Sequence, residues 1–359
     1  MMGEKVFVKG CVAVAEAALR AGCRFFAGYP ITPQNDIPEY MAANLPKVGG
    51  VFVQGESEVA SVNMVYGASA TGFRAMTSSS SCGMSLKSEG ISYLAGANLP
   101  AVICSVMRGG PGVGVIQPSQ QDYFQATKAH GNGGFRLLVY APANLQEAAD
   151  YTYKAFFKAD EYQCPVMVLL DGIQGTMMEP VEFPEAVSDE EVAAFRTAKE
   201  WAVVGRKGDT IHSVDSGHRP FQEEFNKRNA EKYEIWKKTE TLVEEYLTED
   251  ADIIFAAYGI SARIAMTAID VLREEGYKVG MIRPITLFPF PTHTFRKLDP
   301  EKVKYILSIE MSIPPQFTED VNNAVLEKIP VHTCLRSGGE IMRWEDIVDR
   351  VHELCGKEA

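Results

Sequence analysis

The sequence predicts an α/β fold with two parallel-sheet domains, and three observations support this. Apolar strand signals alternate with helical signals along most of the chain, as they do in parallel α/β domains. Some strand segments, such as residues 165–171, are apolar throughout, which is typical of a sheet covered on both faces. A chain of 359 residues is also too long for one ordinary core and favours two domains.

The first domain is expected to span residues 1–185. Its elements are expected in this order: helix 13–21, strand 24–28, helix 35–43, strand 51–54, helix 58–71, strand 74–77, helix 86–95, strands 101–106 and 137–140, helix 146–159 and strand 165–171. Acidic residues in the early turns of helix 35–43 suit the positive end of the helix dipole.

The composition of the sequence changes after residue 179. This change marks a connection, which we expect to cover residues 186–248 as a linker and a bracing helix at 221–246. The second domain is expected to span residues 249–359. Its predicted elements are strands 253–259, 278–284, 305–310 and 331–334 and a helix at 261–275. Ser261 is expected to cap that helix. The proline-stiffened segment 283–290 is expected to be a docking surface and not a catalytic loop.

Composition excludes several classes of function. The formal net charge of -12 argues against binding to nucleic acid or to an anionic membrane surface. The sequence shows no signal peptide and no apolar run near the about 20 residues that a membrane helix needs, so we expect a cytoplasmic protein. The seven scattered cysteines contain no CxxC pair, and the histidines form no motif, so no metal or iron–sulfur site is expected on this chain.

Three junctions between a predicted strand and the next turn stand out, because open α/β sheets bind ligands at the carboxyl ends of their strands. They are the proline-bracketed turn 29–33, the acidic helix start 54–58 and the glycine-rich loop 106–114. Each has a plainer interpretation, as a rigid turn, a compensated helix dipole or a flexible loop. The spacing GxGxxG is absent, so the dinucleotide fingerprint fails.

Within these junctions, four side chains are suited to ligand chemistry. Tyr29 and Thr32 are the only side-chain donors of the first turn. Glu58 begins a helix that otherwise looks buried, so its carboxylate needs a specific partner. Arg108 ends a strand with a planar fork that suits a carboxylate.

Four motifs, in this order and spacing, resemble the pyrimidine-binding domain of 2-oxoacid:ferredoxin oxidoreductase α subunits: residues 28–33 (GYPITP), 56–60 (ESEVA), 77–80 (TSSS) and 107–111 (MRGGP). The segment from Tyr258 to Pro289 looks like the transketolase C-terminal-like domain that follows in that family. Residues 116–120 and 171–180 look most like the branched-chain branch, which acts on 3-methyl-2-oxobutanoate (2-oxoisovalerate).

The resemblance implies roles for individual residues. Glu58 matches the glutamate that hydrogen-bonds the N1′ nitrogen of the thiamine diphosphate aminopyrimidine and so activates the cofactor. Tyr29, Pro30 and Thr32 fall in the turn that contacts the cofactor. Thr32 and Arg108 match residues that hold the carbonyl and carboxylate of the 2-oxoacid. The implied reaction is coenzyme A-dependent oxidative decarboxylation with reduction of ferredoxin.

The resemblance also implies partners. A β subunit shares the thiamine diphosphate and carries its Mg²⁺ and a [4Fe-4S] cluster, and a γ subunit and a ferredoxin-like δ subunit complete the assembly. This chain is therefore expected to be inactive on its own. Two positions depart from the family pattern, Cys82 where proline is common and Cys11 where asparagine is common.

Three alternatives stay open. The substrate is open between a branched-chain acid and 2-oxoglutarate, pyruvate or indolepyruvate, of which 2-oxoglutarate would need a second cation. A non-redox enzyme resembling transketolase is a second alternative, and an inactive scaffold subunit is a third. The presence of Glu58, Thr32 and Arg108 speaks against the scaffold.

Overall fold

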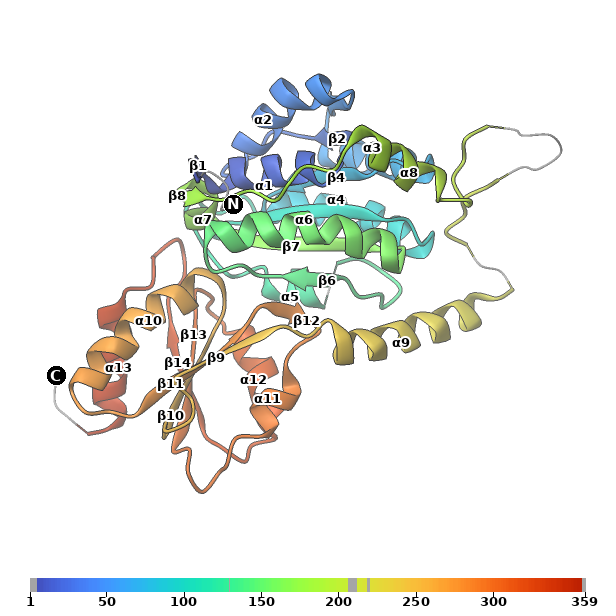
Figure 1. Ribbon diagram of the computed structural model, residues 1–359. Helices are drawn as coiled ribbons and strands as arrows, with labels where there is room; N and C mark the ends of the chain where they lie inside the picture. Colours follow the sequence, from blue (N-terminus) through green and yellow to red (C-terminus); the bar gives the residue numbers. More distant parts are fainter. Residues whose placement is uncertain (1–4, 129, 206–211, 218–219, 357–359) are drawn as a thin grey trace.

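The computed structural model describes residues 5–128, 130–205, 212–217 and 220–356. Two main sheets, each covered by helices, confirm the predicted α/β class with mostly parallel strands (Figure 1). Each sheet also has one antiparallel strand at an edge, which the sequence did not predict.

The first sheet has seven strands, six of them parallel. In spatial order they are β12 (Thr286–Phe288), β6 (Leu138–Tyr140), β7 (Pro165–Asp171), β5 (Ala101–Met107), β4 (Ala75–Ser79), β2 (Phe25–Gly28) and β3 (Val51–Gln54). The antiparallel strand β12 lies within the proline-stiffened segment 283–290 and pairs with β6. This segment therefore docks on the first sheet of its own chain.

Helices cover both faces of the first sheet. One face carries α1 (Gly10–Arg20), α2 (Asp36–Asn44) with the 3₁₀ turn η1 (Leu45–Val48), and α6 (Leu145–Tyr162); the other carries α3 (Glu58–Ala70), α4 (Ser81–Gly96) and α5 (Tyr123–Thr127). Helices α3 and α4 approach closely because their facing residues are small. A Cβ at Gly90 would come within 2.8 Å of Val62 Cγ2. This packing holds the first turn of α3 against α4.

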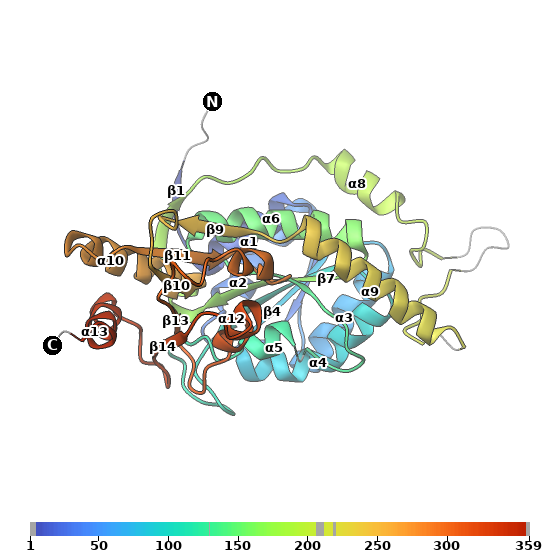
Figure 2. The ribbon, with the colours of Figure 1, turned by 90° about the horizontal axis from the view of Figure 1, so that it is seen from below.

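The connection between the sheets differs from the expected linker and single helix. The first domain ends with α7 (Gly172–Thr176) and the strand β8 (Met178–Val181), which pairs with β1 (Val6–Lys9). The connection then contains α8 (Asp189–Thr197), α9 (Gln222–Thr239) and β9 (Val243–Tyr246). The predicted helix 221–246 is thus wrong at its end, since Val243–Tyr246 joins the edge of the second sheet. Helix α9 runs along the first domain (Figure 2), fastened by the fully buried Trp236, which packs against Tyr162.

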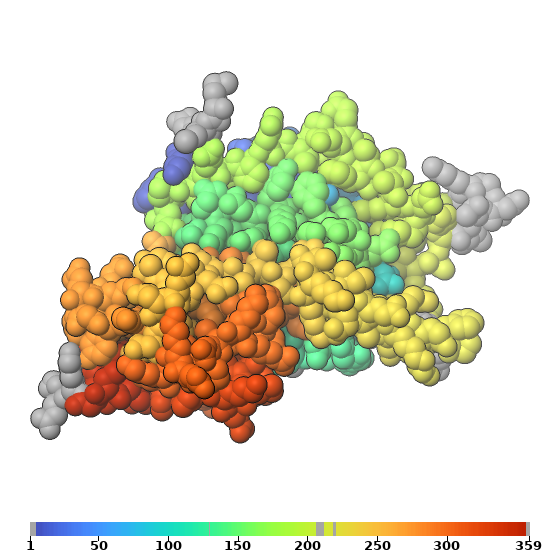
Figure 3. All heavy atoms as spheres, turned by 60° about the horizontal axis from the view of Figure 1, so that its bottom comes forward, coloured from blue at the N-terminus to red at the C-terminus, as the bar shows by residue number. Residues whose placement is uncertain are grey.

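The second sheet has five strands in the order β14 (Val331–Leu335), β13 (Tyr305–Glu310), β10 (Ile253–Ala257), β11 (Val279–Pro284) and β9. One face carries α10 (Gly259–Glu274) and α13 (Trp344–Leu354), and the other α11 (Thr292–Arg296) and α12 (Phe317–Val325). The face with α11 and α12 shares a hydrophobic core with the first domain, so the two units pack tightly together (Figure 3).

Polar contacts cross the same interface. The buried Gln120 side chain donates to the carbonyl of Tyr258 at 3.0 Å and accepts from the Ser261 hydroxyl at 2.7 Å and from the Met311 N–H at 3.0 Å. The predicted capping role of Ser261 is wrong, because α10 begins two residues earlier, at Gly259, and the Ser261 hydroxyl reaches across to the first domain. Arg283 pairs with Glu147 of α6.

Candidate active site

The predicted site residues gather at one edge of the first sheet. Strands β5, β4, β2 and β3 are consecutive neighbours and run parallel, so their carboxyl ends lie at the same edge. Directly after these ends come Arg108, the serine-rich start of α4, the turn 29–33 and the start of α3. Segments far apart in the sequence therefore meet where this fold binds ligands.

Glu58 is the first residue of α3. The Ser57 hydroxyl caps that helix by accepting from the Ala60 N–H at 3.1 Å. The Glu58 side chain is only 6% exposed, yet no described residue donates a hydrogen bond to its carboxylate. The carboxylate lies against Gly83 of α4, where an added Cβ would come 2.6 Å from Glu58 Oε1. Only glycine leaves this space beside the carboxylate.

Two serines, Ser79 at the end of β4 and Ser80 directly before α4, lie at this edge of the sheet. The Oγ atoms of Ser79 and Ser80 are buried and have no hydrogen-bond partner among the described residues. An added Cβ at Gly83 would also collide with Ser79 Oγ, so Ser79 and Glu58 border the same small space. Buried polar groups without partners are uncommon, and such a cluster indicates a site for a polar ligand.

Arg108 and Thr32 are brought into direct contact. The guanidinium donates from Nη1 to the Thr32 carbonyl at 2.8 Å and from Nη2 to the Val113 carbonyl at 3.0 Å. Nη2 also lies 3.2 Å from the sulfur of Cys82, which is next to Gly83 in α4. Arg108 is 7% exposed, and its Nε is buried without a partner among the described residues. The predicted substrate residues thus adjoin the space beside Glu58.

Tyr29 and Pro30 lie less deeply. Both are exposed in the turn after β2, and the Tyr29 carbonyl accepts from the Gln34 side chain at 3.3 Å. Among the described residues, neither forms a hydrogen bond to Glu58 or Arg108. Cys11, the other departure from the family pattern, is buried, and its sulfur lies 3.8 Å from the Pro33 carbonyl.

Sequence reasoning missed Asp122 and its contact with Ser81. The Ser81 hydroxyl bonds to the Asp122 carboxylate and accepts from the backbone N–H of Arg108 at 3.0 Å. Ser81 has a φ of 32°, in the left-handed region, so this contact is held at some backbone strain. Burial raises the pKa of Asp122 to about 6. No motif marks Asp122, which lies in an irregular segment.

The sequence analysis also missed Lys87, although a signal for it exists. Positions 83, 87, 90 and 94 form one helical stripe, and in the structure all four are buried. A lysine among glycines and a leucine on such a stripe is out of place on a core-facing surface. Helical periodicity alone could have singled it out.

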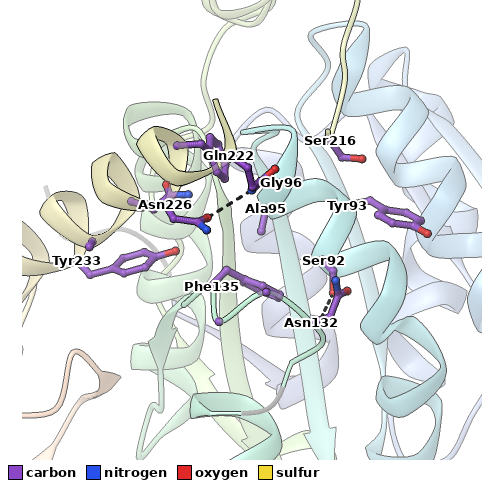
Figure 4. A pocket seen from close by; sticks show the side chains of 15 residues that line it. Ser92, Tyr93, Ala95, Gly96, Asn132, Phe135, Ser216, Gln222, Asn226 and Tyr233 are labelled. Atoms are coloured by element: carbon purple, nitrogen blue, oxygen red, sulfur yellow. Dashed lines mark hydrogen bonds between the residues drawn. The ribbon is translucent and has the colours of Figure 1, made fainter. Parts of the chain in front are cut away.

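A cavity of about 560 Å³ lies away from these residues, between α4, α9 and the loop at 132–135 (Figure 4). Its described lining, which includes Tyr93, Phe135 and Tyr233, contains no charged side chain. It therefore offers no acid or base. Tyr29, Thr32, Glu58 and Arg108 do not line it.

The described ranges contain neither a metal-binding cluster nor a membrane-spanning helix. No group of three or more His, Cys, Asp or Glu side chains is arranged there to hold a metal ion. None of the helices in those ranges has both the length and the apolar character needed to cross a bilayer.

Comparison with known families identifies the family to which this chain belongs. Residues 16–247 match the family described as Pyruvate flavodoxin/ferredoxin oxidoreductase, thiamine diP-bdg, and residues 251–347 match Pyruvate:ferredoxin oxidoreductase core domain II. The chain is a 2-oxoacid:ferredoxin oxidoreductase subunit. The expected family and class of enzyme are thereby confirmed, and the first match establishes a thiamine diphosphate-binding domain.

Relatives of the subunit include the Ketoisovalerate oxidoreductase subunit VorB of Methanothermobacter thermautotrophicus, which is 46% identical over 97% of both chains. The 2-oxoglutarate synthase subunit KorA of the same organism is 35% identical, over 98% of this chain and 100% of that one. Among solved structures, a 2-oxoglutarate:ferredoxin oxidoreductase from Magnetococcus marinus matches with a TM-score of 0.84 and 25% identity, over 98% of the subunit and 65% of that chain. The subunit therefore spans slightly less than two thirds of that chain. A split gene transketolase, with a TM-score of 0.58 and 15% identity, shares the fold alone.

Proposed function

We propose that this subunit is the α subunit of a branched-chain 2-oxoacid:ferredoxin oxidoreductase and activates thiamine diphosphate through Glu58. The proposed reaction is coenzyme A-dependent oxidative decarboxylation of 3-methyl-2-oxobutanoate to acyl-CoA and CO₂, with reduction of ferredoxin. One observation carries the proposal. In a chain of this family, the buried Glu58 carboxylate lies against Gly83 and has no hydrogen-bond partner among the described residues.

The residues around Glu58 fit the polar edge of an aminopyrimidine ring. Gly83 lets α4 lie close to the carboxylate, and the unpartnered Ser79 hydroxyl beside it can bond to a ring nitrogen or the amino group. Glu58 would share a proton with the ring nitrogen that it faces, which is work that a carboxyl group can do near neutral pH. When bound, thiamine diphosphate supplies the electron sink for decarboxylation. Tyr29, Pro30 and Thr32 would contact the cofactor from the neighbouring turn.

Arg108 would bind the carboxylate of the 2-oxoacid, and Thr32 its carbonyl. The guanidinium is already held by the Thr32 and Val113 carbonyls, so its orientation is fixed before a substrate arrives. Its Nε–H remains without a partner among the described residues and can donate to a substrate oxygen. A fixed cation of this kind loses little conformational entropy on binding.

The branched-chain assignment is supported by the higher identity to the ketoisovalerate relative, 46% against 35% for a 2-oxoglutarate relative. The loop that follows Arg108 also presents the apolar side chains of Val113, Val115 and Ile116 to solvent. Such side chains suit a branched hydrocarbon better than a second carboxylate. The alternative substrate is 2-oxoglutarate, because the solved structural relative is a 2-oxoglutarate:ferredoxin oxidoreductase with that acid bound.

Partners and location belong to the same proposal. A β subunit would share the thiamine diphosphate and hold its diphosphate, Mg²⁺ and a [4Fe-4S] cluster, and γ and ferredoxin-like δ subunits would complete the assembly. The described cysteines are all free and scattered, which agrees with clusters on other chains and with a reducing, cytoplasmic compartment. We also keep the proposed division at residues 1–185, 186–248 and 249–359.

The test is Glu58→Gln in the complete complex, purified without oxygen and assayed with coenzyme A, a viologen dye and a panel of 2-oxoacids. We expect turnover to fall about 100-fold or more while assembly is unchanged, because the amide cannot share a proton as the carboxyl does. Glu56→Gln, at an exposed position two residues earlier, is the matched control and should keep normal turnover. Near-normal turnover of the Glu58 variant would overturn the assignment. Activity highest with 2-oxoglutarate would shift it to the alternative substrate.

A further inference from the structure

Helix α4 contains a fully buried lysine for which the proposed function has no role. Lys87 is 0% exposed. Its Nζ donates to the Thr77 hydroxyl at 3.0 Å and to the backbone carbonyl of Glu58 at 3.4 Å. A lysine is almost never buried completely, and a methionine or leucine would fill the same core position without the cost of burying an amine.

The place of Lys87 in α4 relates it to the Glu58 side chain. Gly83 and Lys87 are four residues apart and so lie on one face of the helix, one turn apart. The Glu58 carboxylate lies against Gly83, while the Glu58 carbonyl bonds to Lys87. The amine thus holds the main chain of the residue whose carboxylate lies one turn away. The two side chains form no direct ion pair, so any influence of the charge acts through space.

Lys87 bridges three elements at this edge of the sheet. The Thr77 hydroxyl that accepts from Lys87 donates in turn to the Ala27 carbonyl of β2, at 2.6 Å. The Lys87 amine therefore links α4 to the first turn of α3 and to β4, and through the Thr77 hydroxyl to β2. This chain of bonds ends at Ala27, two residues before the turn 29–33 begins.

The charge of this amine can change near neutral pH. Burial lowers the pKa of Lys87 to about 7, and the negative charge of Glu58 opposes that shift. The groups that face Lys87 are Glu58 from α3, the Thr77 hydroxyl from β4 and, behind it, the Ala27 carbonyl of β2. Asp122 and Arg108 contact α4 only at its first turn.

We propose that Lys87 is a positioning residue for Glu58, which fixes the first turn of α3 and whose charge competes, through space, with the cofactor ring for the Glu58 carboxylate. This inference rests on the proposed function of Glu58. A charged amine attracts the Glu58 carboxylate and so opposes its hydrogen bond to the ring, and a neutral amine leaves the carboxylate to the cofactor. Activity therefore rises as the pH rises and Lys87 loses its proton.

The test is the pH profile of kcat/KM for the assembled complex with Lys87→Met, which removes the charge and keeps an apolar chain of similar length. In the unmodified enzyme, loss of one proton near pH 7 should raise kcat/KM about tenfold between pH 6 and pH 8. This acidic limb should disappear in the Met variant. Lys47→Met, at an exposed lysine of η1, is the matched control and should keep the limb.

Thr77→Val provides a second variant in case the first fails to assemble. It removes the hydroxyl that accepts from Lys87, so the charged amine becomes less favourable and the acidic limb should move to lower pH. An unchanged profile in Lys87→Met, or in Thr77→Val where only that variant assembles, overturns the role of Lys87. The Glu58→Gln variant distinguishes failure of this inference from failure of the proposed function. An inactive Glu58→Gln with an unchanged Lys87→Met profile refutes this inference alone, and an active Glu58→Gln refutes the proposed function.

Discussion

Replacing Gly83 by alanine should disable the site while leaving the fold intact. The added Cβ would come 2.6 Å from Glu58 Oε1 and would also collide with the Ser79 hydroxyl. Ordinary contact begins at 3.4 Å, so the Glu58 carboxylate has to move by about 0.8 Å. This movement changes the position from which we propose that Glu58 meets the cofactor ring.

The expected magnitude follows from this displacement. A misplacement of about 1 Å costs a catalytic arrangement about 100-fold in rate. We therefore expect kcat/KM to fall by roughly that factor. Stability should change little, because alanine favours a helix over glycine by about 1 kcal/mol and so offsets part of the steric overlap.

The assay is coenzyme A-dependent reduction of a viologen dye by the complete complex, with thermal unfolding measured on the same preparation. Gly67→Ala is the matched control, since Gly67 lies on α3 and an added Cβ there meets nothing within 4 Å. The control should be fully active. If Gly83→Ala were as active as Gly67→Ala, the reasoning that the Glu58 carboxylate works from its present position would be refuted.

Two further predictions concern Arg108 and the domain interface. Arg108→Ala should raise the KM for the 2-oxoacid at least tenfold, because it removes the proposed cation for the substrate carboxylate, and steady-state kinetics would show an unchanged KM if another residue binds the acid. Gln120→Ala should lower the free energy of unfolding by about 2 kcal/mol, because it removes the acceptor of the buried Met311 N–H and Ser261 hydroxyl, and equal denaturant midpoints for the variant and the unmodified protein would contradict this.

Most strands of the two sheets, and the edge at which the candidate site residues gather, could be predicted because they depend on local signals. Apolar runs ending in glycine or proline identify the strands, and parallel strands bring their carboxyl ends to one edge whatever the rest of the chain does. The sequence therefore suffices to expect that Thr32, Glu58 and Arg108 lie near one another. The structure places Thr32 against Arg108, and Cys82 and Gly83 lie between this pair and Glu58.

What could not be predicted depends on contacts between distant segments. The segment Val243–Tyr246 has charged residues in its middle that suit a helix, and it becomes a strand because β11 offers it an edge. Ser261 resembles a helix cap in the sequence, but its hydroxyl donates to the side chain of Gln120, which is far away in the sequence. Tertiary contacts override local propensity in both cases.

The second domain has a physical connection to the site, although the proposed function places no catalytic residue in it. The loop after Arg108 closes on itself, since Arg108 pairs with Pro118 and the Gly109 N–H donates to the Gln117 carbonyl at 3.0 Å. Directly beyond this closure, the Gln120 backbone N–H donates to the Met311 carbonyl of the second domain at 2.9 Å. The base of the loop is thus fixed from both domains, while its apolar tip stays exposed. If Arg108 binds the 2-oxoacid as proposed, a loop fastened in this way would present it in one orientation, and the second domain would contribute through the anchor it provides.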